Sequence, residues 1–250
     1  MMLDGLEDAY DSGRLMGTFA EDCAEQYQFT REQQDNFATE SLARAIAATE
    51  NGAFEREIEA VSLTSREQTQ TVTVDEQLTA AKLEKIRTLK PAFRKGGTVT
   101  AANSSSISDG AAALLLASYS FAVANKLPVR ALIRGHCSYA QSPNMFTTAP
   151  IGAAKKLLDR LGWEKESVDL WEVNEAFAVV AMAFTRDMAL RSERVNVNGG
   201  ACALGHPIGA SGVRIIITLL NALEKREGSR GIAAVCIGGG EATVIVIERV

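Results

Sequence analysis

Residues 196–212 have the sequence Asn196-Val197-Asn198-Gly199-Gly200-Ala201-Cys202-Ala203-Leu204-Gly205-His206-Pro207-Ile208-Gly209-Ala210-Ser211-Gly212. This segment is dense in glycine, it holds one of the two histidines of the chain, and an apolar run typical of a helix follows it. A glycine-rich loop that enters a helix presents backbone N–H groups and the positive end of the helix dipole to a ligand. An imidazole in such a loop transfers protons near neutral pH. A tight turn that packs a helix against a strand has the same pattern, so this segment alone leaves both interpretations open.

Two further segments carry polar side chains where predicted strands end. Glu172-Val173-Asn174-Glu175-Ala176-Phe177 lies between a strand and a helix, and ligands bind at that edge of an α/β sheet. Asn174 there either caps the helix or binds an anion or a water. Cys236-Ile237-Gly238-Gly239-Gly240 places a thiol beside a turn. Cys236 is therefore either a small core residue or a group for proton transfer or nucleophilic attack.

The C-terminal part of the chain alternates strand and helix patterns. These patterns predict strands at 131–138 and 168–173, helices at 151–161, 176–190 and 213–223, and a final hairpin made of 231–237 and 243–248. Thr147-Thr148-Ala149-Pro150 predicts a capped helix start. The alternation predicts an α/β layer architecture with a mainly parallel sheet.

The first 103 residues are polar and rich in helix signals. Thr18-x-x-Glu21 and Thr30-x-x-Gln33 each predict a capping box, and Asn51-Gly52 predicts the end of the second, longer helix. Residues 58–63 and 69–74 alternate like two short, partly exposed strands. Residues 82–89 predict a weaker helix that ends before Pro91. We expect this part to be an insert or a lid rather than a complete core.

The middle of the chain combines a loop with an apolar run. Residues 97–106 are small and polar, which suits either a solvent-exposed loop or a loop that lets a ligand approach the backbone. Residues 111–118 are small and apolar and predict a fully buried strand, with a buried helix as the alternative. Residues 120–126 are expected to be helical.

Composition excludes several classes of function. The net charge is −5 and no run of Lys or Arg is present, which argues against nucleic-acid binding. No stretch is apolar for long enough to span a membrane. The four cysteines are far apart, which argues against a disulfide framework or a metal site and fits a reducing, cytoplasmic location.

Asn-Glu-Ala-Phe at 174–177, Gly-His-Pro at 205–207 and Cys-x-Gly-Gly-Gly at 236–240, in this order, resemble the thiolase family. The resemblance is to its acetyl-CoA acetyltransferase, or biosynthetic thiolase, branch and runs along essentially all of the chain. It implies the thiolase fold, an α/β fold layered αβαβα and built from two similar halves. Residues 1–105 would be the CoA-binding loop domain, 106–127 the tail of the N-terminal half, and 128–250 the C-terminal half.

The resemblance also implies a reaction. Thiolases catalyse a reversible Claisen condensation of two acetyl-CoA molecules to acetoacetyl-CoA and CoA, or the thiolysis of a 3-ketoacyl-CoA. By resemblance, His206 activates a nucleophilic cysteine and, with Asn174 acting through a water, holds the thioester oxygen. Cys236 takes the α-proton of the second substrate, and the N–H of Gly238 belongs to the oxyanion hole.

CoA and acyl-CoA are expected as substrates, with no metal and no covalently bound cofactor. The residues implied to line the CoA path are Leu6, Met16, Phe93, Ala101, Ser105 and Phe177. A homo-oligomer, a dimer or a tetramer, is common in the family, and neither nucleic acid nor membrane is expected as a partner.

The resemblance leaves one expected element unmatched. Family members carry a further N-terminal segment with the cysteine that becomes acylated, and we expect that this chain lacks it and is inactive alone. The apolar run 111–116 would then lose its parent sheet and promote association or aggregation. A thiolase-like protein that only binds acyl-CoA or lipid is one alternative. A condensing enzyme of the ketoacyl synthase type is another, although such enzymes use Asn or a second His in place of Cys236.

Overall fold

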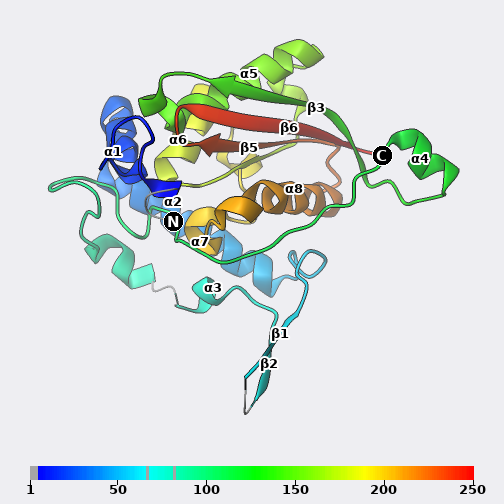
Figure 1. Cartoon of the computed structure of the whole chain (residues 1–250), viewed down its shortest axis with the longest axis horizontal. Helices are drawn as coiled ribbons and strands as arrows, with labels where there is room; N and C mark the ends of the chain where they lie inside the picture. Colours follow the sequence, from blue (N-terminus) through cyan, green and yellow to red (C-terminus); the bar gives the residue numbers. More distant parts are fainter. Residues whose placement is uncertain (1–4, 66–67, 81–82) are drawn as a thin grey trace.

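The computed structural model describes residues 5–65, 68–80 and 83–250 (Figure 1). Its helices and strands are α1 (Met16–Tyr27), α2 (Arg31–Glu50), β1 (Val61–Thr64), β2 (Thr69–Val72), α3 (Glu76–Ala80), η2 (Leu83–Thr88), α4 (Tyr119–Ala124), β3 (Ala131–Ala140), η3 (Pro143–Thr148), α5 (Ala149–Leu161), η4 (Lys165–Ser167), β4 (Leu170–Val173), α6 (Ala178–Asp187), η5 (Ser192–Arg194), α7 (Ala201–Leu204), α8 (Ile208–Lys225), β5 (Arg230–Ile237) and β6 (Glu241–Arg249). In this part of the chain no helix combines the length and the apolar character needed to cross a bilayer.

A four-stranded sheet of order β3-β6-β5-β4 forms the centre of the C-terminal part. β4 and β5 are parallel, whereas β5 and β6 form the predicted antiparallel hairpin and β3 pairs antiparallel with β6. The prediction of a mainly parallel sheet is therefore wrong. The hairpin turn at Gly238–Gly240 reverses the chain, and β3 joins the outer side of the returning strand.

Helices cover both faces of this sheet, as Figure 1 shows. Alternate residues of β5 point to opposite faces: Ile232, Ala234 and Cys236 pack in the core with α1, α5 and α6, and Ala233 packs with α8. This period of two follows from the pleat of a strand. Cys236 therefore belongs to the layer that also contains α1, while α8 lies behind the sheet.

The predicted elements of the C-terminal part are confirmed, with shifted ends. The helix predicted at 176–190 runs only from Ala178 to Asp187, and the strand predicted at 168–173 begins at Leu170. The helix predicted at 213–223 begins earlier, at Ile208, immediately after Pro207. Pro at the start of a helix costs no hydrogen bond, because the first N–H groups of a helix have no intrahelical partner.

In the first part of the chain one capping box is confirmed and the other is not. Thr30 and Gln33 form the reciprocal pair that starts α2, and Asn51 ends it. The Thr18–Glu21 box is wrong, because α1 begins at Met16 and the Thr18 hydroxyl donates to the carbonyl of Leu15. The Glu21 carboxylate instead accepts hydrogen bonds from the backbone N–H groups of Thr98 and Val99, a contact between distant segments that no local pattern encodes.

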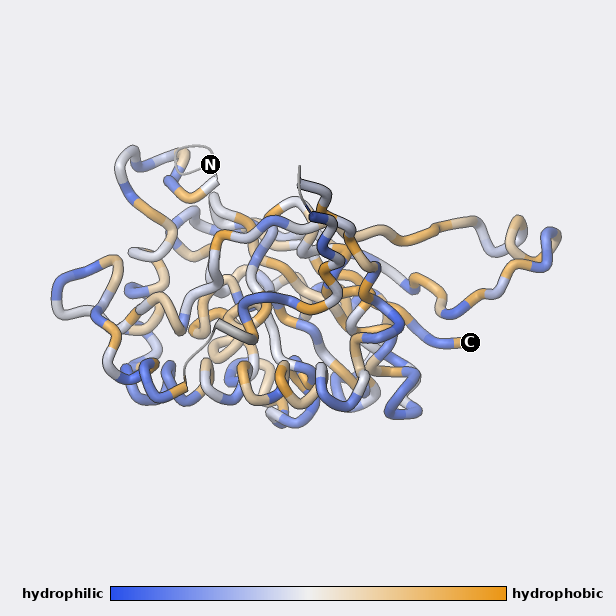
Figure 2. The backbone as a smooth tube through the Cα atoms, turned by 90° about the horizontal axis from the view of Figure 1, so that it is seen from below, coloured by the Kyte–Doolittle hydropathy of each residue, from blue (hydrophilic) through white to orange (hydrophobic). Residues whose placement is uncertain are grey.

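The two short strands predicted at 58–63 and 69–74 are present as β1 and β2, which pair antiparallel, and the helix expected at 120–126 is α4, which ends at Ala124. The predicted helix at 82–89 is a 3-10 helix over Leu83–Thr88, and Lys82 lies outside the described residues. The prediction of a buried strand at 111–118 is wrong. This segment has no regular structure, and together with α4 it forms an arm that projects from the body of the molecule (Figure 2). Leu115 is 91% exposed because no strand of the described chain lies beside it.

Candidate active site

Asn174 and Cys236 lie at the carboxyl ends of two neighbouring strands, β4 and β5. β4 ends at Val173, which is in register with Ala234 of β5, and the N–H of Asn174 donates to the Ala234 carbonyl at 2.9 Å. Two residues further along β5 lies Cys236. Since neighbouring strands are about 5 Å apart, the two side chains start from the same edge of the sheet. The N-cap of α6 is Phe177, so the interpretation of Asn174 as a helix cap is wrong.

His206 joins this edge from the glycine-rich segment. Its Nε2 lies 3.3 Å from the Asn174 side-chain nitrogen, and its Nδ1 lies 2.6 Å from the Ser211 hydroxyl. Asn174 is 1% exposed, and its Oδ1 has no hydrogen-bond partner among the described residues. A buried amide oxygen without a partner is costly, and a bound water or a substrate group would satisfy it.

Burial sets the protonation of both reactive groups. Desolvation, helped by the positive charge of Arg214, lowers the pKa of His206 to about 4, so the imidazole is neutral at pH 7. Burial raises the pKa of Cys236 to about 12, so this thiol is protonated at rest. The site therefore combines a neutral imidazole with a protonated thiol.

A buried carboxylate shapes the glycine-rich segment. Glu175 is fully buried and accepts hydrogen bonds from the Ser41 hydroxyl, the Asn196 amide and the backbone N–H of Cys202. A Cβ on Gly200 would lie 2.3 Å from this carboxyl group, so only glycine fits at that position. Glu175 thus fixes the loop that leads to His206.

The polar loop at 103–106 forms hydrogen bonds with two segments of the candidate site. Ser105 donates to the Ala176 carbonyl from its N–H at 3.0 Å and from its hydroxyl at 2.9 Å. The N–H of His206 donates to the Ser106 carbonyl at 3.1 Å. The loop therefore lies against the segment that follows Asn174 and against the catalytic candidate His206.

Four of the six residues implied for CoA lie in one region. The rings of Phe93 and Phe177 meet edge to face, with centroids 5.9 Å apart, and Ser105 is bonded beside Phe177. Met16 lies next to the Gly238 turn, because a Cβ on Gly238 would be 3.2 Å from the Met16 sulfur. Gly17, next to Met16 on α1, packs against the Phe93 ring, so α1 connects the Gly238 turn to an aromatic wall formed by Phe93 and Phe177.

Leu6 and Ala101 lie at the margins of this region. Ala101 is exposed in the loop before Asn103. Leu6 is half-buried in the N-terminal segment, where its neighbour Gly5 approaches Ile208 at the start of α8. The structure brings neither of them into a hydrogen bond or ring contact with the other CoA candidates within the described residues.

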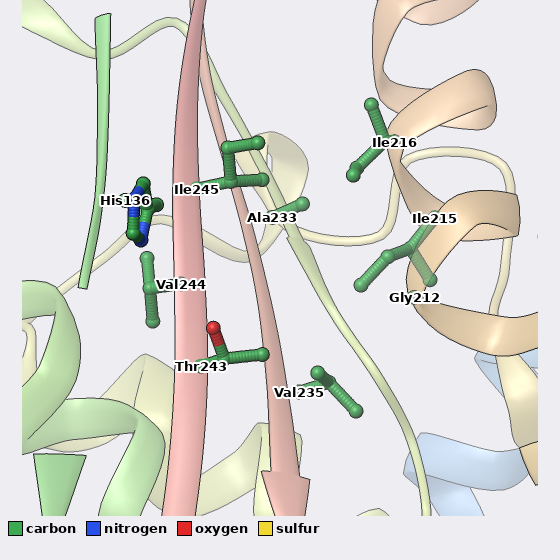
Figure 3. Close-up of a pocket in the computed structure, with 9 residues that line it drawn as sticks. All are labelled: His136, Gly212, Ile215, Ile216, Ala233, Val235, Thr243, Val244 and Ile245. Atoms are coloured by element: carbon green, nitrogen blue, oxygen red, sulfur yellow. The ribbon is translucent and has the colours of Figure 1, made fainter. Parts of the chain in front are cut away.

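A pocket of about 200 Å³ lies elsewhere, between α8 and the face of the sheet that α8 covers (Figure 3). Its lining is almost entirely apolar, from Ile215, Ile216, Val235 and Ile245 among others, with His136 at one side. It contains none of the candidate catalytic residues. The candidate active site therefore lies at the Asn174–His206 contact and not in this pocket.

Sequence reasoning missed three residues that hold the site together: Ser41, Glu175 and Ser211. Glu175 lies in a quoted motif, but a carboxylate is usually exposed, and its burial depends on α2. Ser211 lies five residues after His206 in the first turn of α8, which is the one signal that could have indicated a hydrogen bond back to the loop. Within the described ranges, no group of three or more His, Cys, Asp or Glu residues is suitable for a metal ion.

Comparison with known proteins agrees with these motifs. The thiolase C-terminal domain model matches residues 127–249, and the thiolase N-terminal domain model matches residues 1–120. Acetyl-CoA acetyltransferase 2 of Arabidopsis thaliana is 50% identical over 99% of this chain and 62% of its own length. Acetyl-CoA acetyltransferase of Pseudomonas aeruginosa is 46% identical over 100% of this chain and 64% of its own length.

Solved structures give the same result for the fold. The Bacillus anthracis acetyl-CoA acetyltransferase superposes with a TM-score of 0.95 at 39% identity, over 98% of this chain and 62% of that chain. The Acat5 thiolase from Ascaris suum, solved in complex with coenzyme A, gives a TM-score of 0.92 at 44% identity, over 99% of this chain and 63% of that chain. This chain thus spans about three-fifths of the length of the relatives it matches. The α/β architecture is the thiolase fold, and the chain belongs to the thiolase family.

Proposed function

We propose that this chain carries the proton-transfer and CoA-binding part of an acetyl-CoA acetyltransferase site. The reaction is the reversible condensation of two acetyl-CoA molecules to acetoacetyl-CoA and CoA. One observation carries the proposal: the Asn174 side-chain nitrogen lies 3.3 Å from Nε2 of His206, at the edge of the sheet where β5 carries Cys236. The acetyl-CoA acetyltransferases among its relatives support the choice of substrate.

Cys236 exchanges a proton with the α-carbon. In the thiolysis direction, the enolate of departing acetyl-CoA takes the proton of the Cys236 thiol, so an S–H bond breaks and a C–H bond forms. The protonated resting state of this buried thiol suits that step. In the condensation direction the thiol first gives its proton to the CoA thiolate that leaves the first acetyl group, and the resulting thiolate then accepts the α-proton of the second acetyl-CoA.

Once its Nε2 has taken a proton, His206 holds, together with Asn174, the oxygen on which negative charge develops, with a water between the amide and the thioester. The unpaired Oδ1 of Asn174 supplies a place for such a water. The N–H of Gly238 faces the tetrahedral intermediate as an oxyanion donor. Removal of one such donor typically costs about 100-fold to 1,000-fold in rate.

CoA binds along the aromatic wall of Phe93 and Phe177. Met16 is next to Gly17, which packs against the Phe93 ring, and Ser105 is bonded to Ala176 beside Phe177. Leu6 and Ala101 are proposed to contact CoA further along its path. No further cofactor is proposed. The loop domain at 1–105 would hold CoA, residues 106–127 would complete a sheet in the N-terminal half, and residues 128–250 would supply the C-terminal half.

The nucleophile that takes the acyl group comes from outside these 250 residues. Cys236 has the proton-transfer role, and burial raises the pKa of Cys23 to about 11. Burial and the neighbouring Glu175 also raise the pKa of Cys202. A nucleophilic cysteine needs a depressed pKa, so neither Cys23 nor Cys202 is activated. The working enzyme would be a cytoplasmic homo-oligomer, a dimer or a tetramer, as is common in the family.

Two measurements test this proposal. Calorimetric titration of the 250-residue chain with CoA should show binding, and ¹H NMR in D₂O should show that the chain exchanges the methyl protons of acetyl-CoA. Cys236→Ala should abolish the exchange and retain CoA binding. Cys137→Ala, which removes another buried thiol on β3, should retain both. Absence of CoA binding by the folded chain would overturn the proposal.

Thiolysis of acetoacetyl-CoA separates the roles further. The chain alone should not turn over this substrate. Turnover by the chain alone would show that one of its own cysteines, Cys202 or Cys236, serves as nucleophile, and the assignment of roles would be wrong.

A second candidate is a thiolase-like protein that binds acyl-CoA or lipid without catalysis. The raised pKa values of Cys23 and Cys202 favour it, because neither thiol is activated. Proton exchange distinguishes the two candidates. Binding of acetyl-CoA without exchange of its methyl protons would favour the carrier.

A further inference from the structure

Ser211 is a buried hydroxyl beside the candidate catalytic histidine. It lies in the first turn of α8 and is 0% exposed. Its Oγ donates a hydrogen bond to the carbonyl oxygen of Pro207, at 3.0 Å. A hydroxyl group has a single proton, so this bond uses the only one that Ser211 can donate.

The same oxygen lies 2.6 Å from Nδ1 of His206. With the hydroxyl proton directed to the Pro207 carbonyl, Ser211 accepts at this contact and Nδ1 carries a proton. In a neutral imidazole only one nitrogen is protonated. We infer that Ser211 is a positioning residue that fixes His206 in the Nδ1–H tautomer and leaves the lone pair on Nε2.

The other side of the ring agrees with this assignment. Nε2 faces the side-chain nitrogen of Asn174, which can only donate, so a lone pair on Nε2 completes a normal hydrogen bond at 3.3 Å. The opposite tautomer would place two donors against each other at Nε2 and leave Nδ1 without a proton to give Ser211. Both faces of the imidazole therefore select the same tautomer.

The tautomer determines what His206 offers to a ligand. A lone pair on Nε2 makes that nitrogen the acceptor of a proton from a thiol or from CoA, and the protonated ring then donates from the same atom. This catalytic consequence rests on the function proposed above. The tautomer itself does not, and it is measurable without substrate.

The experiment uses the two histidines of the chain. In protein with ¹⁵N-labelled histidine, long-range ¹H–¹⁵N spectra at pH 7 distinguish a protonated from an unprotonated ring nitrogen. His136→Gln removes the signals of the other, exposed histidine and so assigns those of His206. We expect His206 to show a protonated Nδ1 and an unprotonated Nε2. A protonated Nε2 in the wild-type chain would overturn the inference.

Variants then test the role of the hydroxyl. Ser211→Ala should shift His206 toward a mixture of tautomers, and Ser211→Thr, which keeps a hydroxyl, should restore the wild-type pattern. Thr218→Ala removes another buried hydroxyl of α8, one bonded to Glu57, and should leave the pattern unchanged. An unchanged tautomer in folded Ser211→Ala would also overturn the inference.

The rate of acetyl-CoA proton exchange provides a separate readout. It should fall about 10-fold or more in Ser211→Ala, with CoA affinity retained. If the wild-type chain shows the expected tautomer and no exchange, the proposed function fails while the role of Ser211 stands.

Discussion

The hydroxyl of Ser41 donates a hydrogen bond of 2.7 Å to the buried carboxylate of Glu175, 134 residues further along the chain. Ser41 lies on α2, in the polar first part of the chain, and Glu175 follows the strand β4. The same hydroxyl accepts from the N–H of Gly200, at 3.0 Å. One serine therefore connects α2 with both the end of β4 and the loop that leads to His206.

This connection should be measurable as a coupling energy. Glu175→Ala would remove the acceptor that the Ser41 hydroxyl, the Asn196 amide and the Cys202 N–H share, and should lower the free energy of unfolding by about 3–5 kcal/mol. Ser41→Ala should cost about 1–3 kcal/mol. The double mutant should cost less than the sum, by about 0.5–3 kcal/mol.

Denaturant unfolding of the four proteins gives this cycle. Thr49→Ala is the control on α2, since its hydroxyl bonds only to the carbonyl of its own helix, and it should change little. Additive costs for Ser41 and Glu175 would show that the contact is not energetically coupled.

The second prediction concerns Gly17, which packs against the Phe93 ring of the aromatic wall. A Cβ on Gly17 would lie 2.3 Å from the ring of Phe93, so Gly17→Ala must displace that ring from Phe177. If the wall binds CoA, the variant should bind CoA several-fold more weakly, although it removes no contact atom. Calorimetric titration measures the change.

Gly212→Ala is its matched control. It also adds one methyl group to a helical glycine, but no atom lies within 4 Å of the added carbon. It should keep its CoA affinity and gain about 0.5–1 kcal/mol of stability, because alanine favours the helix. Equal CoA affinity in Gly17→Ala and Gly212→Ala would remove Phe93 from the proposed binding surface.

How far the sequence determined these features depends on the range of the interactions involved. The Thr30–Gln33 capping box and the final hairpin depend on residues that are close in the chain, and both are confirmed. The motif residues Asn174 and His206, which lie in separate segments, do come into contact. That contact was expected from the family resemblance and not from any local pattern.

Other features depend on partners that no local pattern reveals. Glu21 was expected to cap a helix, and it binds backbone 77 residues away instead. The sheet is mixed because the reversed strand β6 of the hairpin lies between β5 and β3, and alternation of strands and helices does not encode that position of β6. The apolar run at 111–118 has the composition of a buried strand, but burial requires a neighbouring strand that the described chain does not place there.

Glu172 predicts a dependence of stability on pH. Burial raises the pKa of this carboxyl group to about 8. The positive charge of Arg214, whose Nη1 lies 4.0 Å from Oε2 of Glu172, lowers this pKa but offsets only part of the effect of burial. Between pH 4.5 and 8 the unfolded chain therefore releases a proton that the folded chain retains. The stabilisation is complete below pH 4.5 and is lost as the pH rises through 8.

Glu172→Gln imitates the protonated state and should remove this loss. The wild-type free energy of unfolding should fall, relative to the variant, by on the order of 2–4 kcal/mol between pH 5 and 8. Glu193→Gln removes an exposed carboxylate and should follow the wild type. Parallel pH profiles for the wild type and Glu172→Gln would show that Glu172 is ionised in the folded chain.

The exposed arm leads to the last prediction. Leu115 and Leu116 are 91% and 68% exposed, and on α4 Phe121 is 56% exposed. Figure 2 shows this arm extending away from the body of the molecule. Apolar surface of this kind, in an extended segment, favours pairing with another chain. We therefore expect the isolated chain to self-associate at micromolar concentration.

Multi-angle light scattering across a dilution series tests this expectation. Leu115→Ser combined with Leu116→Ser should shift the distribution toward the 26.8 kDa monomer, because it removes apolar area from the arm and no core contact. Leu63→Ser, an equally polar change on the exposed hairpin β1–β2, should not. If the wild-type chain is monodisperse at 26.8 kDa and melts cooperatively, then the arm does not drive association and the prediction is wrong.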